Sequence, residues 1–150
     1  STTMRGAAVA IDLSAQMLER ARHRVSRLGL RHRALLVRAD ATRLPLPAAS
    51  FDAAACFFSL HCIPDQPAVL GELARVLRPG ARLGGATICA DPPLPWRLLV
   101  AGAAGAYADF FVPPKQEQLA RWGAEAGFDW HQERAGAILY FTAIRLGGMR

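Results

Sequence analysis

The sequence contains no apolar run long enough to cross a membrane. No stretch of 18 apolar residues occurs, and the longest candidate, residues 98–106, is short and rich in small side chains. Because a membrane-spanning helix needs about 20 consecutive apolar residues, this argues against a transmembrane segment. The first residues also lack the basic stretch, long apolar core and cleavage signal of a secretory peptide. We therefore predict a cytoplasmic protein with no membrane partner.

Cysteine patterns that bind metals are missing as well. The three cysteines, Cys56, Cys62 and Cys89, form no CxxC pair and have no paired histidines at zinc-ligand spacing. Each lies in an apolar neighbourhood of the sequence. We predict three buried free thiols and no metal site.

Lysine is almost absent. Lys115 is the only lysine, although basic residues outnumber acidic ones 18 to 12 and the formal net charge is +6. The arginines are spread along the chain, and the densest group, within residues 20–33, falls on and just after a predicted helix, where arginines commonly face solvent. This distribution does not favour a nucleic-acid partner.

The composition is that of a folded protein. Of the 150 residues, 52% are hydrophobic and 20% charged, which fits a globular chain with a sizeable core and excludes a disordered one. The length predicts a single domain over residues 1–150.

Short apolar runs with β-type composition alternate with helical patterns along the chain. Strands are predicted at residues 8–11, 34–38, 52–58 and 82–89, with two closing strands at 128–135 and 137–145. Helices are predicted at residues 14–28, 66–77 and from 115 to about 127. This alternation is typical of an α/β sheet, and the last two strands predict an antiparallel finish.

Local signals mark where the helices begin and end. Ser14 and Asp65 are good N-caps, and Gly29 stands where a helix end favours a left-handed residue. The "RPG" stretch at residues 78–80 predicts a turn into the following strand.

Acidic residues follow or flank several of the predicted strands. In α/β sheets ligands bind beyond the carboxyl ends of the strands, so Asp12 and Asp40 are candidate site residues. Asp12 could accept both hydroxyls of a ribose, or could instead cap the helix start. Asp40 could accept from an adenine amino group, or could cap the turn that follows it. Asp52 is interpreted as structural.

Three stretches together resemble a known family. "VAIDLSAQMLERAR", "VRADATRLPLPAASFDAAACFFSLHCIPD" and "ELARVLRPGARLGGATI" are similar, in order and spacing, to the small-molecule class I S-adenosylmethionine-dependent methyltransferases. The stretch "AEAGFDWHQERAGAILYFTAIR" resembles the last helix and strand pair of that family. The resemblance implies an α/β fold with a Rossmann-like sheet, helices on both faces, S-adenosyl-L-methionine as cofactor and a small-molecule methyl acceptor.

The resemblance also implies roles for individual residues. Asp12 would hold the cofactor ribose and Leu13 would pack on the adenine. Further residues that would contact the cofactor are Asp40 and Ala41 at the adenine edge, and Cys56 and Phe57 at the end of the third predicted strand.

His61 stands where many members of the family carry a histidine. Two interpretations stay open for it. It could be a catalytic base, or it could only line the cofactor pocket, which is sufficient because methyl transfer from a sulfonium depends mainly on alignment.

One part of the family pattern has no counterpart in this sequence. Members place a strand, a Gly-rich turn of the type "D-x-G-x-G-x-G" and a helix before the ribose acid, whereas only eleven residues precede Asp12 here. We therefore expect the first strand and helix to be absent from this chain. The neighbouring strands would then expose edges that invite homo-oligomer formation or strand exchange. Two alternatives to the enzyme stay open: a non-catalytic partner of a complete methyltransferase, and an NAD-dependent oxidoreductase.

The segment from Asp91 to Pro114 is the predicted cover of the methyl acceptor. It contains the aromatic residues Trp96, Tyr107, Phe110 and Phe111. An apolar or aromatic small molecule would fit these side chains, which could equally be packing residues of a helical lid.

Overall fold

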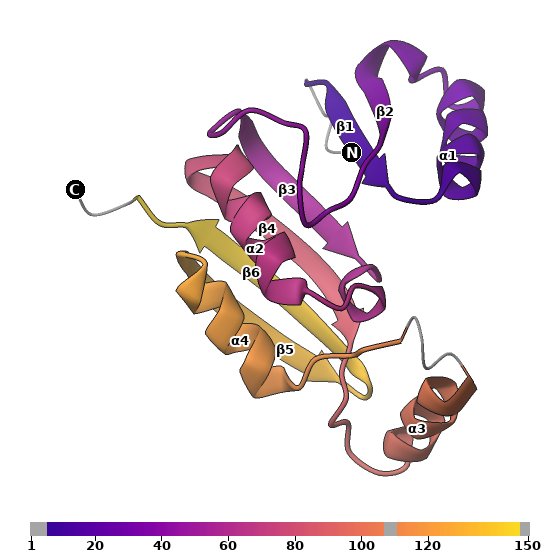
Figure 1. Cartoon of the computed structure of the whole chain (residues 1–150), viewed down its shortest axis with the longest axis vertical. Helices are drawn as coiled ribbons and strands as arrows, with labels where there is room; N and C mark the ends of the chain where they lie inside the picture. Colours follow the sequence, from indigo (N-terminus) through magenta and orange to yellow (C-terminus); the bar gives the residue numbers. More distant parts are fainter. Residues whose placement is uncertain (1–5, 107–110, 148–150) are drawn as a thin grey trace. The chain divides into compact units, whose positions relative to one another are not determined.

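The computed structural model of the chain describes residues 6–106 and 111–147 (Figure 1). The chain divides into two compact units, residues 1–45 and residues 46–150. Both units combine strands with helices, as an α/β chain should.

The first unit is built around one pair of parallel strands. Its elements are β1 (Ala8–Asp12), α1 (Ala15–Arg27), the short 3-10 helix η1 (Arg31–Arg33) and β2 (Ala34–Arg38). The two strands pair in register from Ala8 opposite Ala34 to Asp12 opposite Arg38. Because parallel strands need a crossover connection, α1 and η1 occupy the chain between them.

The ends of α1 follow the sequence signals. The hydroxyl of Ser14 accepts a hydrogen bond from the backbone N–H of Met17 at 3.3 Å, which satisfies one of the free donors at the helix start. Gly29 follows the helix with a φ of +68°, a left-handed conformation that glycine adopts without steric cost. Both predictions are confirmed.

The second unit contains a four-stranded mixed sheet. Its elements are β3 (Phe51–Phe57), the 3-10 helix η2 (Leu60–Cys62), α2 (Gln66–Val76), β4 (Leu77–Ile88), α3 (Trp96–Ala106), α4 (Gln116–Glu125), β5 (Phe128–Ala135) and β6 (Ile138–Arg145). The strand order is β3-β4-β6-β5. β3 and β4 are parallel, whereas β6 is antiparallel to both β4 and β5. The predicted antiparallel finish is confirmed.

The "RPG" stretch does not end an element as predicted. β4 begins at Leu77, directly after α2, and runs through residues 78–80. The register with β3 shifts from Phe51 opposite Leu77 to Ala53 opposite Arg82, so the extra residues form an irregularity within the strand. Gly80 has a φ of +80° and permits it. Pairing with the start of β3 therefore extends the strand beyond the turn signal.

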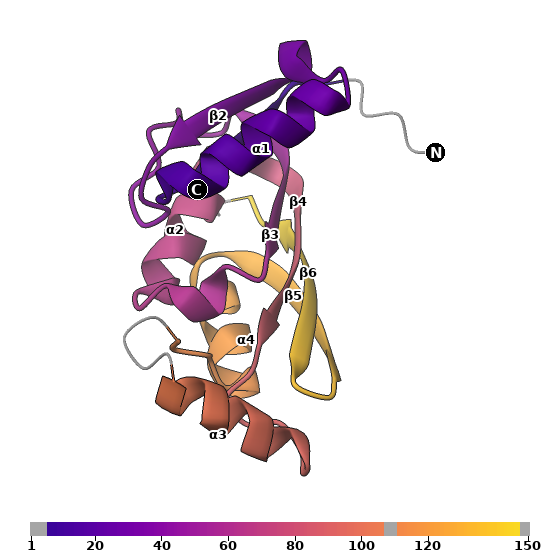
Figure 2. The same ribbon diagram turned by 90° about the vertical axis from the view of Figure 1, so that its right-hand side faces the viewer.

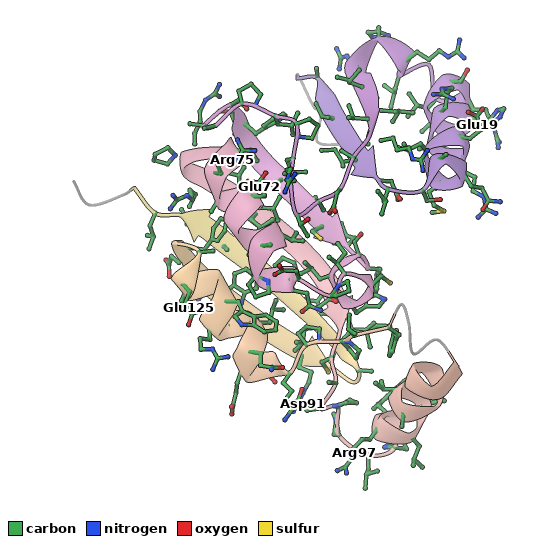
Figure 3. All side chains as sticks on the ribbon, viewed as in Figure 1. Glu19, Glu72, Arg75, Asp91, Arg97 and Glu125 are labelled. Atoms are coloured by element: carbon green, nitrogen blue, oxygen red, sulfur yellow. The ribbon has the colours of Figure 1, made fainter. Side chains whose placement is uncertain are left out.

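Side-chain contacts fix α2 at both ends. Asp65 accepts from the backbone N–H of Ala68 at 3.1 Å, which confirms the predicted N-cap. In the last turn, Arg75 donates to both carboxylate oxygens of Glu72, at 2.7 and 2.8 Å, and to the carbonyl of Leu46 (Figure 3). The guanidinium thus ties the helix to the segment before β3.

Helices α2 and α4 lie on the same face of the four-stranded sheet (Figure 2). The largest side chains that are fully buried are mostly leucines: Leu60, Leu70, Leu77, Leu83, Leu119 and Leu139. Within the described residues, no helix is both long and apolar enough to span a bilayer.

The cysteine prediction is correct for one thiol only. All three cysteines are free, but only Cys89 is buried, whereas Cys56 is half-buried and Cys62 is exposed. In η2 the side chains of Leu60 and His61 are buried and the third residue of the turn faces outward. One turn of helix cannot bury every side chain, whatever its local composition.

Candidate functional site

Two predicted site acids lie where the two parallel strands of the first unit end. Asp12 is the last residue of β1, opposite Arg38 of β2. The backbone N–H of Ala39 donates to the carbonyl of Asp12 at 3.3 Å, and Asp40 is the next residue. The structure therefore brings Asp12 and Asp40 together at the carboxyl end of two neighbouring strands, where α/β sheets bind ligands.

One of the two oxygens of the Asp12 carboxylate is used in a hydrogen bond within the protein. Its Oδ1 accepts from the backbone N–H of Ser14 at 2.8 Å, while Oδ2 has no hydrogen bond within the described part of the chain. The helix-start role foreseen as an alternative is therefore present, although Ser14 provides the N-cap itself. One carboxylate oxygen is left for a ligand.

Leu13 lies between the strand end and the helix cap. Its side chain is 64% exposed, and its carbonyl accepts from Nε of Arg38 at 3.0 Å. The backbone is thus anchored to β2 while the apolar side chain faces outward. This arrangement offers an apolar surface beside Asp12.

Asp40 shapes the turn that follows β2. Its Oδ1 accepts from both the backbone N–H and the hydroxyl of Thr42, each at 2.8 Å. The backbone hydrogen bond from Thr42, and to a smaller extent the one from its hydroxyl, hold the pKa of the Asp40 carboxyl below its usual value. The carboxylate therefore stays ionised at neutral pH, and Oδ2 has no partner among the described residues. Ala41 is half-buried beside it.

The remaining predicted site residues lie in the second unit, at the end of β3. Cys56 and Phe57 are its last two residues. Burial raises the pKa of the Cys56 thiol to about 11, so it is protonated and a poor nucleophile at neutral pH. The ring of Phe57 is 61% exposed.

The chain turns sharply after β3. Phe58 has a φ of +53°, which is unusual for a bulky side chain. Its N–H still donates to the carbonyl of Ala86 at 2.7 Å, but the strand ends there. In a regular parallel ladder, the next carbonyl of β3 would accept from Ile88 of β4. Instead, the N–H of Ile88 lies 3.5 Å from Nδ1 of His61.

His61 is held in a largely apolar setting. It is only 7% exposed, and its Nδ1 lies 3.2 Å from the hydroxyl of Thr87, which is fully buried. The ring meets Phe58 and Phe111 edge-on, with centroids 6.5 and 5.5 Å away. Burial lowers the pKa of His61, so the imidazole is neutral at neutral pH. Its Nε2 has no hydrogen-bond partner within residues 6–106 and 111–147.

The predicted acceptor cover is attached to this histidine through the backbone. Val112 donates to the carbonyl of His61 at 2.7 Å, and its own carbonyl accepts from the buried side chain of Gln66 at 2.6 Å. The Oε1 of Gln66 is buried and has no partner among the described residues. Phe111 is thereby held against the imidazole.

The other end of the cover contains α3. Trp96 packs on the β5–β6 turn, where a Cβ on Gly136 would lie 3.0 Å from the indole. Asp91, labelled in Figure 3, connects the start of the cover to Arg134 and Gln116 by hydrogen bonds of 3.0 and 3.1 Å. The predicted aromatic residues Tyr107 and Phe110 lie outside the described residues.

The sequence analysis missed Thr87 and Gln66. Both are among the few buried polar residues, at 0% and 3% exposure. Their partners lie 26 and 46 positions away in the chain, so no local pattern distinguishes them. Across the described ranges, no group of three or more histidine, cysteine, aspartate or glutamate side chains is placed to hold a metal ion.

Comparison with known proteins identifies the relatives of the chain. A family model described as "Methyltransferase domain" matches residues 2–84. The ubiquinone/menaquinone biosynthesis C-methyltransferase of Pseudomonas savastanoi pv. phaseolicola is 30% identical, over 93% of this chain and 63% of its own length. The 27-O-demethylrifamycin SV methyltransferase of Amycolatopsis mediterranei is 44% identical over 73 residues, which are 49% of this chain and 27% of that protein.

A solved structure shows the same fold. The geranyl diphosphate C-methyltransferase of Streptomyces coelicolor, in complex with S-adenosyl-L-homocysteine, matches 94% of this chain and 63% of its own with a TM-score of 0.76 at 13% identity. The predicted Rossmann-like methyltransferase fold is confirmed. This chain spans 63% of the length of the curated relatives that match most of it. The comparisons give no support to an oxidoreductase or to a non-catalytic partner.

Proposed function

The chain belongs to the class I S-adenosylmethionine-dependent methyltransferases, and we propose that the protein transfers a methyl group from S-adenosyl-L-methionine to a small organic acceptor. When bound, the cofactor supplies a methyl group activated by a sulfonium centre. The contribution of the protein is then to bind, align and keep water away from the reacting atoms.

The placement of Asp12 and Asp40 at the same end of the β1–β2 pair carries this proposal. Both carboxylates stand at the carboxyl edge of β1 and β2, and each keeps one oxygen without a partner in the described residues. Asp12 would accept from the ribose hydroxyls, and Asp40, beside Ala41, from the amino group of adenine. The exposed side chain of Leu13 would pack on the adenine ring. These residue types fit an adenosine group.

Cys56 and Phe57 would line the cofactor from the end of β3. A thiolate beside an activated methyl group would compete with the acceptor as a nucleophile. The raised pKa of Cys56 keeps the thiol protonated and supports an unreactive lining role.

The acceptor is proposed to be a small molecule with apolar bulk. Two relatives are named for acting in ubiquinone or menaquinone biosynthesis and on a demethylrifamycin. In this chain, the cover segment presents exposed apolar side chains, namely Leu94, Trp96, Leu98 and Leu99. Apolar side chains at a site bind apolar parts of ligands.

Cofactor binding tests the proposal directly. S-adenosyl-L-homocysteine and NAD both carry an adenosine with a ribose diol, so they form a matched pair of ligands for calorimetry. We expect the protein to bind S-adenosyl-L-homocysteine more tightly than NAD, because its relatives are methyltransferases. Asp52→Asn is a control, since Asp52 pairs with Arg78 and should leave the affinity unchanged. Failure to bind S-adenosyl-L-homocysteine, or tighter binding of NAD, would contradict the proposal.

The cellular location of the protein and its macromolecular partners are part of the same proposal. We keep a cytoplasmic location and the absence of a nucleic-acid partner as predictions from the sequence. Association between copies through strand edges is supported by the sheets themselves. Within the described residues, β1 pairs only with β2, and β3 only with β4.

A further inference from the structure

We propose that Thr87 is a positioning residue that holds His61 as the tautomer with its proton on Nε2, so that His61 donates a hydrogen bond to the methyl acceptor and takes no proton from it. This inference rests on the proposed methyl transfer for the identity of the ligand. The tautomer itself follows from the contacts of the imidazole.

Two polar groups lie within hydrogen-bond distance of the same ring nitrogen, Nδ1. The backbone N–H of Ile88 lies 3.5 Å from Nδ1 of His61 and can only donate. The hydroxyl of Thr87, 3.2 Å from the same atom, can donate or accept. If Nδ1 carried the proton, the N–H of Ile88 would face another N–H and lose its partner. When Nδ1 accepts, its single lone pair is shared by the two groups in a three-centre hydrogen bond, and no N–H faces another N–H.

The burial of Thr87 strengthens this assignment. The residue is fully buried, and no hydrogen bond of its hydroxyl other than the one to His61 occurs within the described residues. A hydroxyl that only accepted from Nδ1 would leave its own proton unpaired in the protein interior, which is unfavourable. Donation to Nδ1 pairs that proton. Both contacts therefore favour Nε2–H, and the shorter one, from the Thr87 hydroxyl, is the stronger of the two.

The backbone explains why the imidazole occupies this position. Phe58 leaves the strand with a positive φ, so β3 offers no carbonyl to Ile88. The imidazole of His61 takes the place of that carbonyl at the end of the parallel ladder. Nδ1 of His61 thus completes the hydrogen bonding of β4, and Nε2, on the other side of the ring, is directed away from β4.

Nε2 is the polar atom that remains for a ligand. It has no partner among the described residues, and the edges of Phe58 and Phe111 flank the ring. A neutral donor in an apolar setting recognises an atom that accepts hydrogen bonds, such as a carbonyl, ether or deprotonated hydroxyl oxygen. We therefore assign to this site an acceptor that presents such an oxygen to His61.

Nuclear magnetic resonance can read the tautomer directly. Long-range 1H–15N correlation of the protein, labelled with 15N-histidine at pH 8, distinguishes a proton on Nε2 from one on Nδ1. We expect the Nε2–H pattern for His61. In Thr87→Val the Nδ1–H form should become detectable, and Thr87→Ser should restore the original pattern. An Nδ1–H pattern in the unmodified protein overturns the tautomer, and an unchanged pattern in Thr87→Val overturns the role of Thr87.

A matched pair of probes tests the donor role. 1-Tetralone and tetralin share a bicyclic skeleton and differ in one carbonyl oxygen. In the presence of S-adenosyl-L-homocysteine, we expect 1-tetralone to shift the Nε2–H resonance of His61 and tetralin to leave it in place. An equal response to the two probes overturns the donor role. Calorimetry of S-adenosyl-L-homocysteine on the same samples reports separately on the proposed function, because the tautomer does not depend on the cofactor.

Discussion

The indole of Trp130 stacks on the ring of Phe141, with centroids 4.8 Å apart and planes 17° from parallel. A glycine makes room on each side of this pair. A Cβ at Gly123 of α4 would overlap the indole, and a Cβ at Gly85 of β4 would overlap both the Phe141 ring and the carbonyl oxygen of Cys56. The two glycines let α4, β5, β6 and β4 approach closely.

Neighbouring glycines in β4 should therefore respond differently to the same substitution. We expect Gly85→Ala to lower the free energy of unfolding by about 2 kcal/mol or more, because a clash with backbone cannot be relieved by a side-chain rotation. Gly84→Ala should change it by less than about 1 kcal/mol, since its Cβ would meet only the Phe141 carbonyl, at 3.9 Å. Urea unfolding of the two variants measures the difference. Equal losses would contradict the packing described here.

Removal of the Asp12 carboxylate should weaken cofactor binding. We expect Asp12→Ala to reduce the affinity for S-adenosyl-L-homocysteine by about 1.5–3 kcal/mol, the range for a hydrogen bond to a charged group. Calorimetry measures the effect. Ser14→Ala is a suitable control, because it removes the N-cap of α1 but leaves the carboxylate in place. Unaltered affinity in Asp12→Ala would remove this residue from the site.

Burial of His61 should make folding stability depend on pH. Because burial lowers the pKa in the folded state, the unfolded chain binds the proton more readily below the ordinary value of 6.5. This contribution to stability is fully present above pH 6.5 and is lost as the pH falls toward the folded-state pKa. We expect the free energy of unfolding to fall more steeply below pH 6.5 in the unmodified protein than in His61→Gln. Parallel curves from denaturant titrations at several pH values would show that the histidine does not titrate on unfolding.

The edge of β3 that has no partner strand among the described residues should support association between chains. Since Phe58 donates toward β4, strand alternation directs the N–H of Ala55 toward the opposite edge. We expect sedimentation velocity to show association that rises with protein concentration. Ala55→Pro removes that donor and should reduce association, whereas Ala55→Ser keeps it and should not. A concentration-independent monomer would count against strand exchange.

Features set by neighbouring residues were predictable from the sequence. The caps at Ser14 and Asp65 and the glycine after α1 depend on contacts within a few positions, and the structure confirms them. The strand ends at Asp12 and near Phe57 were also found, because apolar runs give way to polar or turning residues there. The candidate cofactor acids follow from the same strand ends.

Features set by distant partners were not predictable. The start of β4 at Leu77 depends on pairing with Phe51, and the role of Thr87 depends on a histidine 26 positions earlier. The bounds of α3 were not predicted either, because the sequence left a helical lid as one of two interpretations of residues 91–114, and the helix begins only at Trp96. The exposure of Cys62 depends on which side of one turn faces the core.

The position of β4 inside its sheet has a consequence for the motions of the site. β4 and β6 have a neighbour on both sides, whereas β3 and β5 have one described neighbour each. Amide protons in doubly flanked strands exchange with solvent most slowly, because they are released only when much of the unit opens. Thr87 and Ile88 belong to such a strand, and they hold the imidazole of His61. Transient fraying of β3 or of the cover segment would therefore leave the histidine ring attached to the longest-lived part of the sheet.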